Sequence, residues 1–249
     1  MSDIKSALQP TDVIHLSDEE ASAEVLKQAV QSLWEVVNNL TRLRRAKSEH
    51  YYVTIFGSAR IQPDQAEYVE VKRLAAELTR MGCGIVTGGG PGLMQAANEG
   101  ASQVEGRDSK HSVGIRIDLP FEQAVNPFVG QMFQHRTFFS RLHQFVLMSE
   151  AFVVVPGGIG TVLELMMIWQ LLQVRKLYGT PLVLLGPMWK DLVAWTHEHM
   201  LVPGSEMVSP LDLEIPQCAN TVEEAIEIVR KDHLEWLASH VDGAAVPSP

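Results

Sequence analysis

The chain has little cysteine, no long apolar run and no excess of basic residues. Its 249 residues include two cysteines, Cys83 and Cys218, without a Cys-x-x-Cys spacing, which favours a reducing compartment. No stretch approaches the roughly 18 uninterrupted apolar residues of a membrane span. The first residues, Met-Ser-Asp-Ile-Lys, are not followed by an apolar signal core. We therefore expect a soluble, cytoplasmic protein without a membrane partner.

The charge balance argues against a nucleic-acid-binding role. Lys and Arg number 20 against 30 Asp and Glu, for a formal net charge of −10. Broad binding to nucleic acid or to an anionic membrane needs a basic surface. A small phosphorylated ligand stays possible, because a few local donors can oppose the global field. Hydrophobic residues make up 46% of the chain, which is ample for one sizeable core.

Short apolar runs alternate with helical patterns from residue 51 onward, and no internal repeat is present. Such alternation, with nearly all-apolar strands, predicts an α/β fold with a parallel sheet covered by helices on both faces. The predicted strands are 51–56, 84–87, 112–117, 151–155 and 181–185. The predicted helices are 64–81, 93–101, 137–149, 160–174, 188–200 and 221–237. We assign residues 51–238 to this domain.

A helical extension is predicted in residues 1–50. Residues 17–20 fit a capping box, and an apolar stripe follows at three- and four-residue steps to about residue 49. The stripe consists of Leu26, Val30, Leu33, Val37 and Leu40. Such a helix either covers the main core or contributes to a dimer surface, and we favour the first interpretation. Residues 239–249 are predicted to form a flexible tail.

Three turns rich in glycine or serine follow predicted strands. They are Gly57-Ser58-Ala59-Arg60, Gly88-Gly89-Gly90-Pro91-Gly92 and Gly157-Gly158-Ile159-Gly160. Ligands of such folds bind beyond the carboxyl ends of the strands, so we expect the turns to converge there. Glycine allows close backbone approach, and the N–H groups of a helix start suit a phosphate. Any one turn could be purely structural, whereas the set favours phosphate binding. Neither a Walker A loop nor a Gly-x-Gly-x-x-Gly motif is present.

Thr161 and Glu164 allow two interpretations. Thr-x-x-Glu is a capping-box spacing, so the pair could simply begin a helix. A carboxylate near a helix start is also stabilised as an anion, and could act as a base or as a counter-charge to a cationic transition state. The spacing alone does not separate these roles.

Arg141 precedes Pro156 by fifteen residues, on the helix that leads into the same strand. His135, Arg136, His143 and Glu150 lie in the same segment, which could also be a solvated polar face. Arg136 and Arg141 are five residues apart and do not share one helical face. At most one of the two is therefore expected to point into the site.

A metal site is not predicted. His197 and His199 stand two residues apart on a predicted helix, so their side chains point to nearly opposite sides. Cys83 opens a buried strand and is interpreted as a core residue, and Cys218 has no partner signature.

The two glycine motifs resemble those of the Lonely Guy (LOG) family. The first runs from Gly88 through Met94 and on through Ala96-Ala97-Asn98-Glu99-Gly100-Ala101, and the second is Pro156-Gly157-Gly158-Ile159-Gly160-Thr161-Val162-Leu163-Glu164. The resemblance covers roughly residues 51–200. It implies a Rossmann-like fold and a nucleotide 5′-monophosphate phosphoribohydrolase, a class that includes the cytokinin-activating enzymes. These enzymes give free base and ribose 5-phosphate.

The resemblance also implies roles for individual residues. The family's catalytic arginine and glutamate fall on Arg141 and Glu164. The residues assigned to phosphate or substrate binding are Ser58, Arg60, Gly89, Gly90, Gly92, Met94, Gly157, Gly158, Gly160 and Thr161. Family members share sites across a dimer, which implies a homodimer or higher homo-oligomer here.

The chain departs from the family pattern in two places. Leu142 follows Arg141 where the family often has lysine, and short members lack a helix such as 17–49. Longer bacterial members are therefore the better match, and ordinary nucleotides are possible substrates beside cytokinin ribotides. Similar proteins are sometimes labelled lysine decarboxylases. That chemistry would need a Schiff-base lysine for pyridoxal phosphate, and no lysine lies in the glycine turns or beside Glu164.

The predicted function is hydrolysis of the N-glycosidic bond of an AMP-like or cytokinin-like nucleoside 5′-monophosphate, without metal or organic cofactor. Two non-catalytic alternatives use the same turns. One is a nucleotide sensor. The other is a carrier of a phosphorylated pterin such as the molybdenum cofactor.

Overall fold

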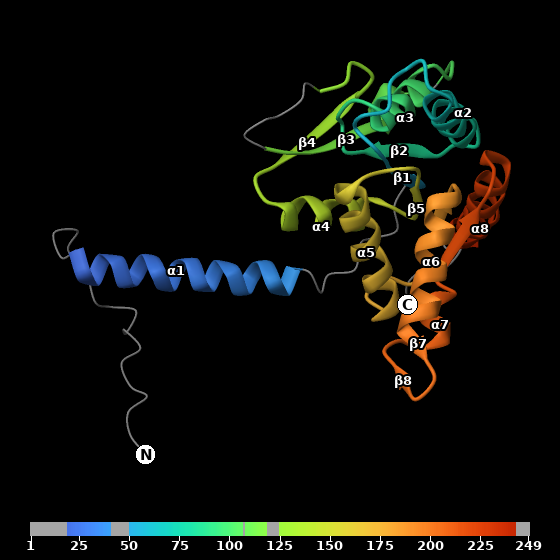
Figure 1. Cartoon of the computed structure of the whole chain (residues 1–249). Helices are drawn as coiled ribbons and strands as arrows, with labels where there is room; N and C mark the ends of the chain where they lie inside the picture. Colours follow the sequence, from blue (N-terminus) through green and yellow to red (C-terminus); the bar gives the residue numbers. More distant parts are fainter. Residues whose placement is uncertain (1–18, 41–49, 107, 119–124, 243–249) are drawn as a thin grey trace. The chain divides into compact units, whose positions relative to one another are not determined.

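The computed structural model describes residues 19–40, 50–106, 108–118 and 125–242, and the chain divides into two compact units (Figure 1). The first unit, Met1–Ala46, contains helix α1 (Glu19–Leu40), whose first turn carries Glu19 and Glu20. Acidic residues there interact favourably with the helix dipole. The predicted cap at 17–18 and the predicted continuation over 41–49 lie outside the described residues. Packing of this helix on the core stays a prediction.

The second unit, Lys47–Pro249, is built on a seven-stranded parallel sheet of described residues. Its strands, in the order in which they pair, are β4 (Gln131–His135), β3 (Ser112–Ile117), β2 (Gly84–Thr87), β1 (Tyr52–Phe56), β5 (Ala151–Val154), β6 (Leu182–Leu185) and β9 (Pro216–Ala219). The five predicted strands are all present. Their side chains are almost all buried, which explains the continuous apolar runs in the sequence.

Helices cover both faces of the sheet, as predicted. One face packs against α2 (Ala66–Arg80), α3 (Leu93–Ser102) and α8 (Val222–Asp242). The other packs against α4 (Phe138–Met148), α5 (Ile159–Gln173), the start of α6 (Pro187–Met200) and the short α7 (Pro210–Leu213). Figure 1 shows these helices around the strands. None of the described helices combines the length and apolar character needed to cross a bilayer.

Several described elements were not predicted. Strands β4 and β9 form the two edges of the sheet. The sequence of β4 is Gln-Met-Phe-Gln-His, with no buried residue, and β9 begins with Pro216. An edge strand tolerates both features, because one side of it needs no partner. A 3-10 turn (Ser109–His111) and a two-residue hairpin, β7 (Leu201–Val202) with β8 (Ser205–Glu206), complete the unit. Helix α8 runs to Asp242, beyond the predicted end near 237.

The strand order reverses beside β1. Strands β1 to β4 follow one another from the centre of the sheet to one edge. Strands β5, β6 and β9 follow one another to the other edge. Strands β1 and β5 pair directly, with Phe56 opposite Val154. In open α/β sheets the crevice at such a switch point is the usual ligand site. The turns after β1 and β5 therefore stand where a ligand is expected.

Candidate functional site

The three predicted turns meet at the carboxyl edge of β2, β1 and β5. The amide of Ser58 donates to the carbonyl of Pro156 (3.0 Å), and the amide of Leu93 donates to the carbonyl of Ser58 (2.8 Å). Gly92 has φ +69°, and a Cβ there would lie 2.3 Å from that same carbonyl. Only glycine fits this approach. The predicted convergence is therefore present, and it joins the starts of α3 and α5.

A buried polar network holds the turn after β2. Thr87 Oγ1 accepts from the amide of Gly89 (2.9 Å) and donates to Asn98 Oδ1 (2.6 Å). Asn126 Nδ2 donates to Asn98 Oδ1 (3.0 Å) and to the carbonyl of Gly90 (2.9 Å). Thr87, Asn98 and Asn126 are all at most 4% exposed. The sequence analysis gave Thr87 and Asn126 no role, because only the folded chain brings 126 against 87–98.

Helix α5 starts without a capping side chain. Its N-cap is Gly158, which makes no side-chain bond, and residues 158–160 are exposed. Thr161 is already inside the helix and 4% exposed, so the Thr161–Glu164 spacing is not a capping box. A Cβ on Gly158 or Gly160 would meet open space, whereas one on Gly157 would lie 2.2 Å from Thr161 Oγ1. The helix thus presents an open, positively polarised end.

Arg141 on α4 and Glu164, near the start of α5, form an ion pair. Arg141 Nη1 lies 2.8 Å from Glu164 Oε1, and the two side chains are only 12% and 10% exposed. Arg141 Nε donates to the carbonyl of Ile115 (3.0 Å), and its guanidinium lies 5.0 Å from the centre of the Phe145 ring. A Cβ on Gly88 would come within 2.6 Å of Arg141 Nη2. The arginine is therefore fixed by strand, helix and turn together.

Burial dominates the electrostatics of the pair. It raises the pKa of Glu164, although the charge of Arg141 and its hydrogen bond oppose the shift. The carboxyl thus takes up a proton more readily than an exposed glutamate does. Such a perturbed carboxyl beside an open helix end is typical of a functional site.

The other predicted binding residues differ in their contacts and in their exposure. Ser58 lies at the convergence of the turns, and its hydroxyl accepts from the amide of Arg60 (3.1 Å). Arg60 itself is exposed. The thioether of Met94 folds against the turn, since a Cβ on Gly88 or Gly90 would come within 2.6 or 2.8 Å of it. Binding roles for these residues and for Gly89 remain predictions.

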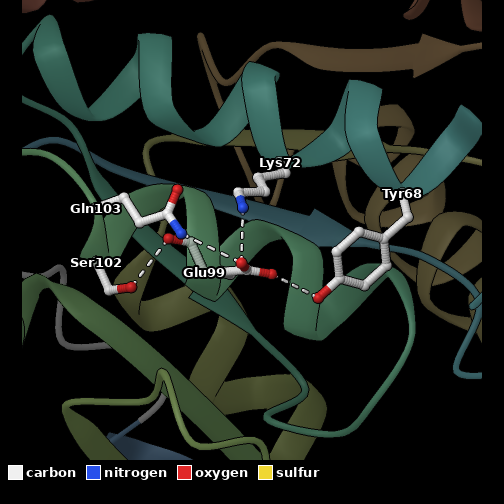
Figure 2. Close-up of polar contacts among 5 residues, drawn as sticks. All are labelled: Tyr68, Lys72, Glu99, Ser102 and Gln103. Carbon is white, nitrogen blue, oxygen red and sulfur yellow. Dashed lines mark hydrogen bonds and ion pairs between the residues drawn. The ribbon is translucent and has the colours of Figure 1, made fainter. Parts of the chain in front are cut away.

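Part of the first glycine motif is structural. Glu99 accepts from Lys72 Nζ (2.6 Å), from the hydroxyl of Tyr68 (2.7 Å) and from Gln103 Nε2 (3.2 Å), as Figure 2 shows. A Cβ on Gly100 would lie 2.1 Å from the carbonyl of Lys72. These contacts attach α3 to α2. They explain the motif residues at 99 and 100 without involving a ligand.

The predicted helix at 137–149 is present as α4, and two of the polar residues named with Arg141 precede it. Thr137 caps α4 by accepting from the amide of Ser140 (3.2 Å), and His135 ends β4. Arg136 is exposed, so Arg141 is the arginine that enters the site. Burial and the charge of Arg141 lower the pKa of His135. No sequence signal singled out His135, because its closeness to Arg141 depends on the pairing of β4 with β3.

The remaining candidates lie elsewhere. His197 and His199 are exposed on α6, and the ring of His199 stacks on Trp195. Among the described residues, no group of three or more His, Cys, Asp or Glu is placed to hold a metal ion. Cys83 is 2% exposed and lies 3.8 Å from His233 Nδ1.

Comparisons with solved structures place this fold among proteins of similar architecture. The molybdenum cofactor carrier protein of Chlamydomonas reinhardtii superposes with a TM-score of 0.53 at 20% identity, covering 75% of this chain and 99% of that one. The molybdenum cofactor binding protein of Rippkaea orientalis gives 0.53 at 19% identity, covering 74% of this chain and 97% of that one. At these identities the likeness concerns the fold alone.

Among curated proteins, the pyrimidine/purine nucleotide 5′-monophosphate nucleosidase of Escherichia coli K12 is 29% identical over 130 residues. The alignment covers 50% of this chain but only 29% of the relative, so the chain matches less than a third of that protein's length. A family model described as "Possible lysine decarboxylase" matches residues 94–229, which include Arg141 and the whole second glycine motif. The chain therefore belongs to this family, which is the LOG family that its glycine motifs resemble.

Proposed function

We propose that the protein hydrolyses the N-glycosidic bond of a nucleoside 5′-monophosphate, releasing the base and ribose 5-phosphate. The observation that carries the proposal is the buried Arg141–Glu164 pair below the open start of α5. The curated relative that is 29% identical to this chain is named a nucleosidase, which supports the same class of reaction.

The start of α5 is suited to the 5′-phosphate. Its exposed first residues have no capping side chain, and Gly158 and Gly160 leave open space where a Cβ would stand. Neither glycine adopts a positive φ, so the backbone conformation at these two positions does not require glycine. Backbone N–H groups and the helix dipole together would bind the dianion.

The ion pair would then act on the sugar. Breaking the ribosyl C–N bond develops positive charge at C1′. The Glu164 carboxylate would stabilise that charge and orient the attacking water. Arg141, held by Ile115 and Phe145, would position the phosphate or the ribose through charge-assisted hydrogen bonds. None of these steps requires a metal or an organic cofactor.

A panel of nucleoside monophosphates tests the proposal. AMP, GMP, IMP, CMP, UMP and a cytokinin ribotide are incubated with the protein, and free base and ribose 5-phosphate are measured. We expect release from at least one nucleotide, and much weaker release from the matching nucleoside, which lacks the phosphate. No release from any of them, with a phosphorylated pterin co-purifying, would favour the carrier alternative instead.

A further inference from the structure

His135 is the last residue of the edge strand β4, and the charge of Arg141 acts on it. It pairs with Ile117 of β3, two residues beyond the carbonyl of Ile115 that Arg141 binds. Alternation along β4 puts His135 on the same face as Phe133, which packs in the core beneath α4 and α5. His135 and Arg141 therefore approach the same end of the sheet from the same side.

The Nε2 atom of the His135 ring is without a partner among the residues that the structure describes. It is buried and makes no hydrogen bond to any of them. A buried polar nitrogen without a partner is destabilising, and such atoms in native proteins are usually matched by water or a ligand. The residue as a whole is only partly buried, so a change of side-chain rotamer would present Nε2 to a bound molecule.

The proposed phosphate site at the start of α5 implies a direction for the base of a bound nucleotide. With the phosphate at the start of α5, after β5, the sugar lies at Glu164. Arg141 reaches from Glu164 past Gly88 to the carbonyl of Ile115 on β3. The base then extends away from β5, along the ends of β2, β3 and β4. That direction leads to His135.

We propose that His135 supplies the proton that the departing base takes up, an inference that rests on the proposed nucleotide hydrolysis. The bond between C1′ and the base nitrogen breaks, and its electron pair goes to the base. A ring nitrogen of the base accepts the proton of the His135 imidazolium. The oxygen of water bonds to C1′, and its proton goes to the Glu164 carboxylate. Proton exchange with solvent restores both side chains.

Two substrates with different leaving groups test this role. Adenine leaves AMP readily only when protonated, whereas nicotinamide leaves nicotinamide mononucleotide as a neutral molecule. Loss of a general acid typically costs about a hundredfold or more. We expect His135→Gln and His135→Phe to lower kcat/KM for AMP by about that factor and to change it for nicotinamide mononucleotide by less than about threefold. Equal losses with both substrates, or no loss with AMP, would overturn the assignment.

The pH profile gives a second readout that uses AMP alone. Among the described residues, the charge of Arg141 from α4 acts on His135, and Glu164 is bonded to that arginine. Asp118, which follows β3, donates its amide to the carbonyl of His135, and Arg136 is next in the chain. His135 is cationic only below its pKa, so kcat of the wild type should fall as pH rises through that pKa. His135→Gln should lack this limb, and a variant that keeps it would contradict the proposal.

The control is His197→Gln, which changes an exposed histidine on α6 and should leave both activities unchanged. Thermal unfolding of each variant identifies loss of structure. A wild type that releases base from no nucleotide would refute the proposed function itself. If the wild type hydrolyses AMP and the His135 variants are equally active, only the role of this residue is refuted.

Discussion

Glu164 illustrates how one side chain acquires its properties from its surroundings. Its carboxyl is buried, its charge is opposed by a single arginine, and burial raises its pKa. Removing one partner of a buried ion pair is costly, because the other charge is left uncompensated. A buried ion pair is weak evidence for stability, because apolar residues of similar volume often fill such a space equally well.

Replacing Glu164 by Gln tests the residue directly. Gln keeps the shape but lacks the negative charge, so we expect nucleotide hydrolysis to fall by about a hundredfold or more. The far-ultraviolet circular dichroism should stay unchanged. Glu198→Gln, on the exposed side of α6, serves as the matched control. Full activity of Glu164→Gln would remove this residue from the mechanism.

The pH dependence of the same site follows from its pKa. The carboxylate form is the active one in the proposed reaction, and the pKa of Glu164 is raised. Activity should therefore fall as pH decreases, beginning at a higher pH than an ordinary glutamate would allow. Initial rates across an acidic pH series measure this limb, and an activity that persists down to the range of an exposed glutamate would contradict it.

His233 predicts a pH effect on stability rather than on activity. Burial lowers its pKa, and the ring lies against Tyr51 with a 4.6 Å centroid distance. The unfolded chain takes up a proton near pH 6.5, before the folded chain does. The free energy of unfolding should thus decrease as pH falls from 6.5 towards the lowered pKa. His233→Phe should show less of this decrease in urea titrations at two pH values, and an identical decrease would disprove the assignment.

At the scale of elements, α5 carries the main functional argument. Its start is open because Gly158 caps nothing and Gly160 adds no side chain, while Gly157 is needed for contact with Thr161. The three neighbouring glycines of one motif thus have different reasons to be glycine. One is explained by packing within the protein, and at the other two a Cβ would meet open space.

The variants Gly160→Ala and Gly157→Ala should separate these reasons. Alanine inside a helix is favoured over glycine by up to about 1 kcal/mol, so Gly160→Ala should not lower the melting temperature. Its methyl group enters the anion site, and we expect KM for AMP to rise about tenfold or more. Gly157→Ala should instead destabilise the fold by about 1–3 kcal/mol, because its Cβ overlaps Thr161. An unchanged KM in Gly160→Ala would argue against phosphate binding at this helix.

At the scale of the whole molecule, apolar side chains remain exposed near the site. Phe139 at the start of α4 is 69% exposed, and Ile159 and Leu163 on α5 are 87% and 47% exposed. Protein interfaces typically contain exposed apolar side chains gathered into a patch. From these exposed side chains and the LOG-family resemblance we propose a homodimer formed through α4 and α5.

Light scattering after gel filtration checks this expectation. The wild type should show twice the mass of a single chain, and Phe139→Ser combined with Leu163→Ser should shift it towards the monomer. Leu211→Ser, which alters a leucine on α7 that is 70% exposed, should leave the mass unchanged. A monomeric wild type would contradict the prediction.

The sequence by itself determined the central strands, the helices between them and the three turns. These depend on local patterns: apolar runs, helical spacing and glycine at strand ends. It did not reveal β4 or β9, because edge strands are only partly buried and lack a continuous apolar run. It also left the Thr161–Glu164 spacing open between a helix cap and a site.

The tertiary structure decided the rest. Helix α5 begins at Ile159, with Gly158 as its N-cap, so Thr161 and Glu164 do not form a capping box. The pairing of β4 with β3 brought His135 beside Arg141, and the segment at Asn126 closed a network with Thr87 and Asn98. Each of these contacts joins residues far apart in the chain. Local patterns carry no information about such pairs, because their formation depends on the order of strands in the sheet.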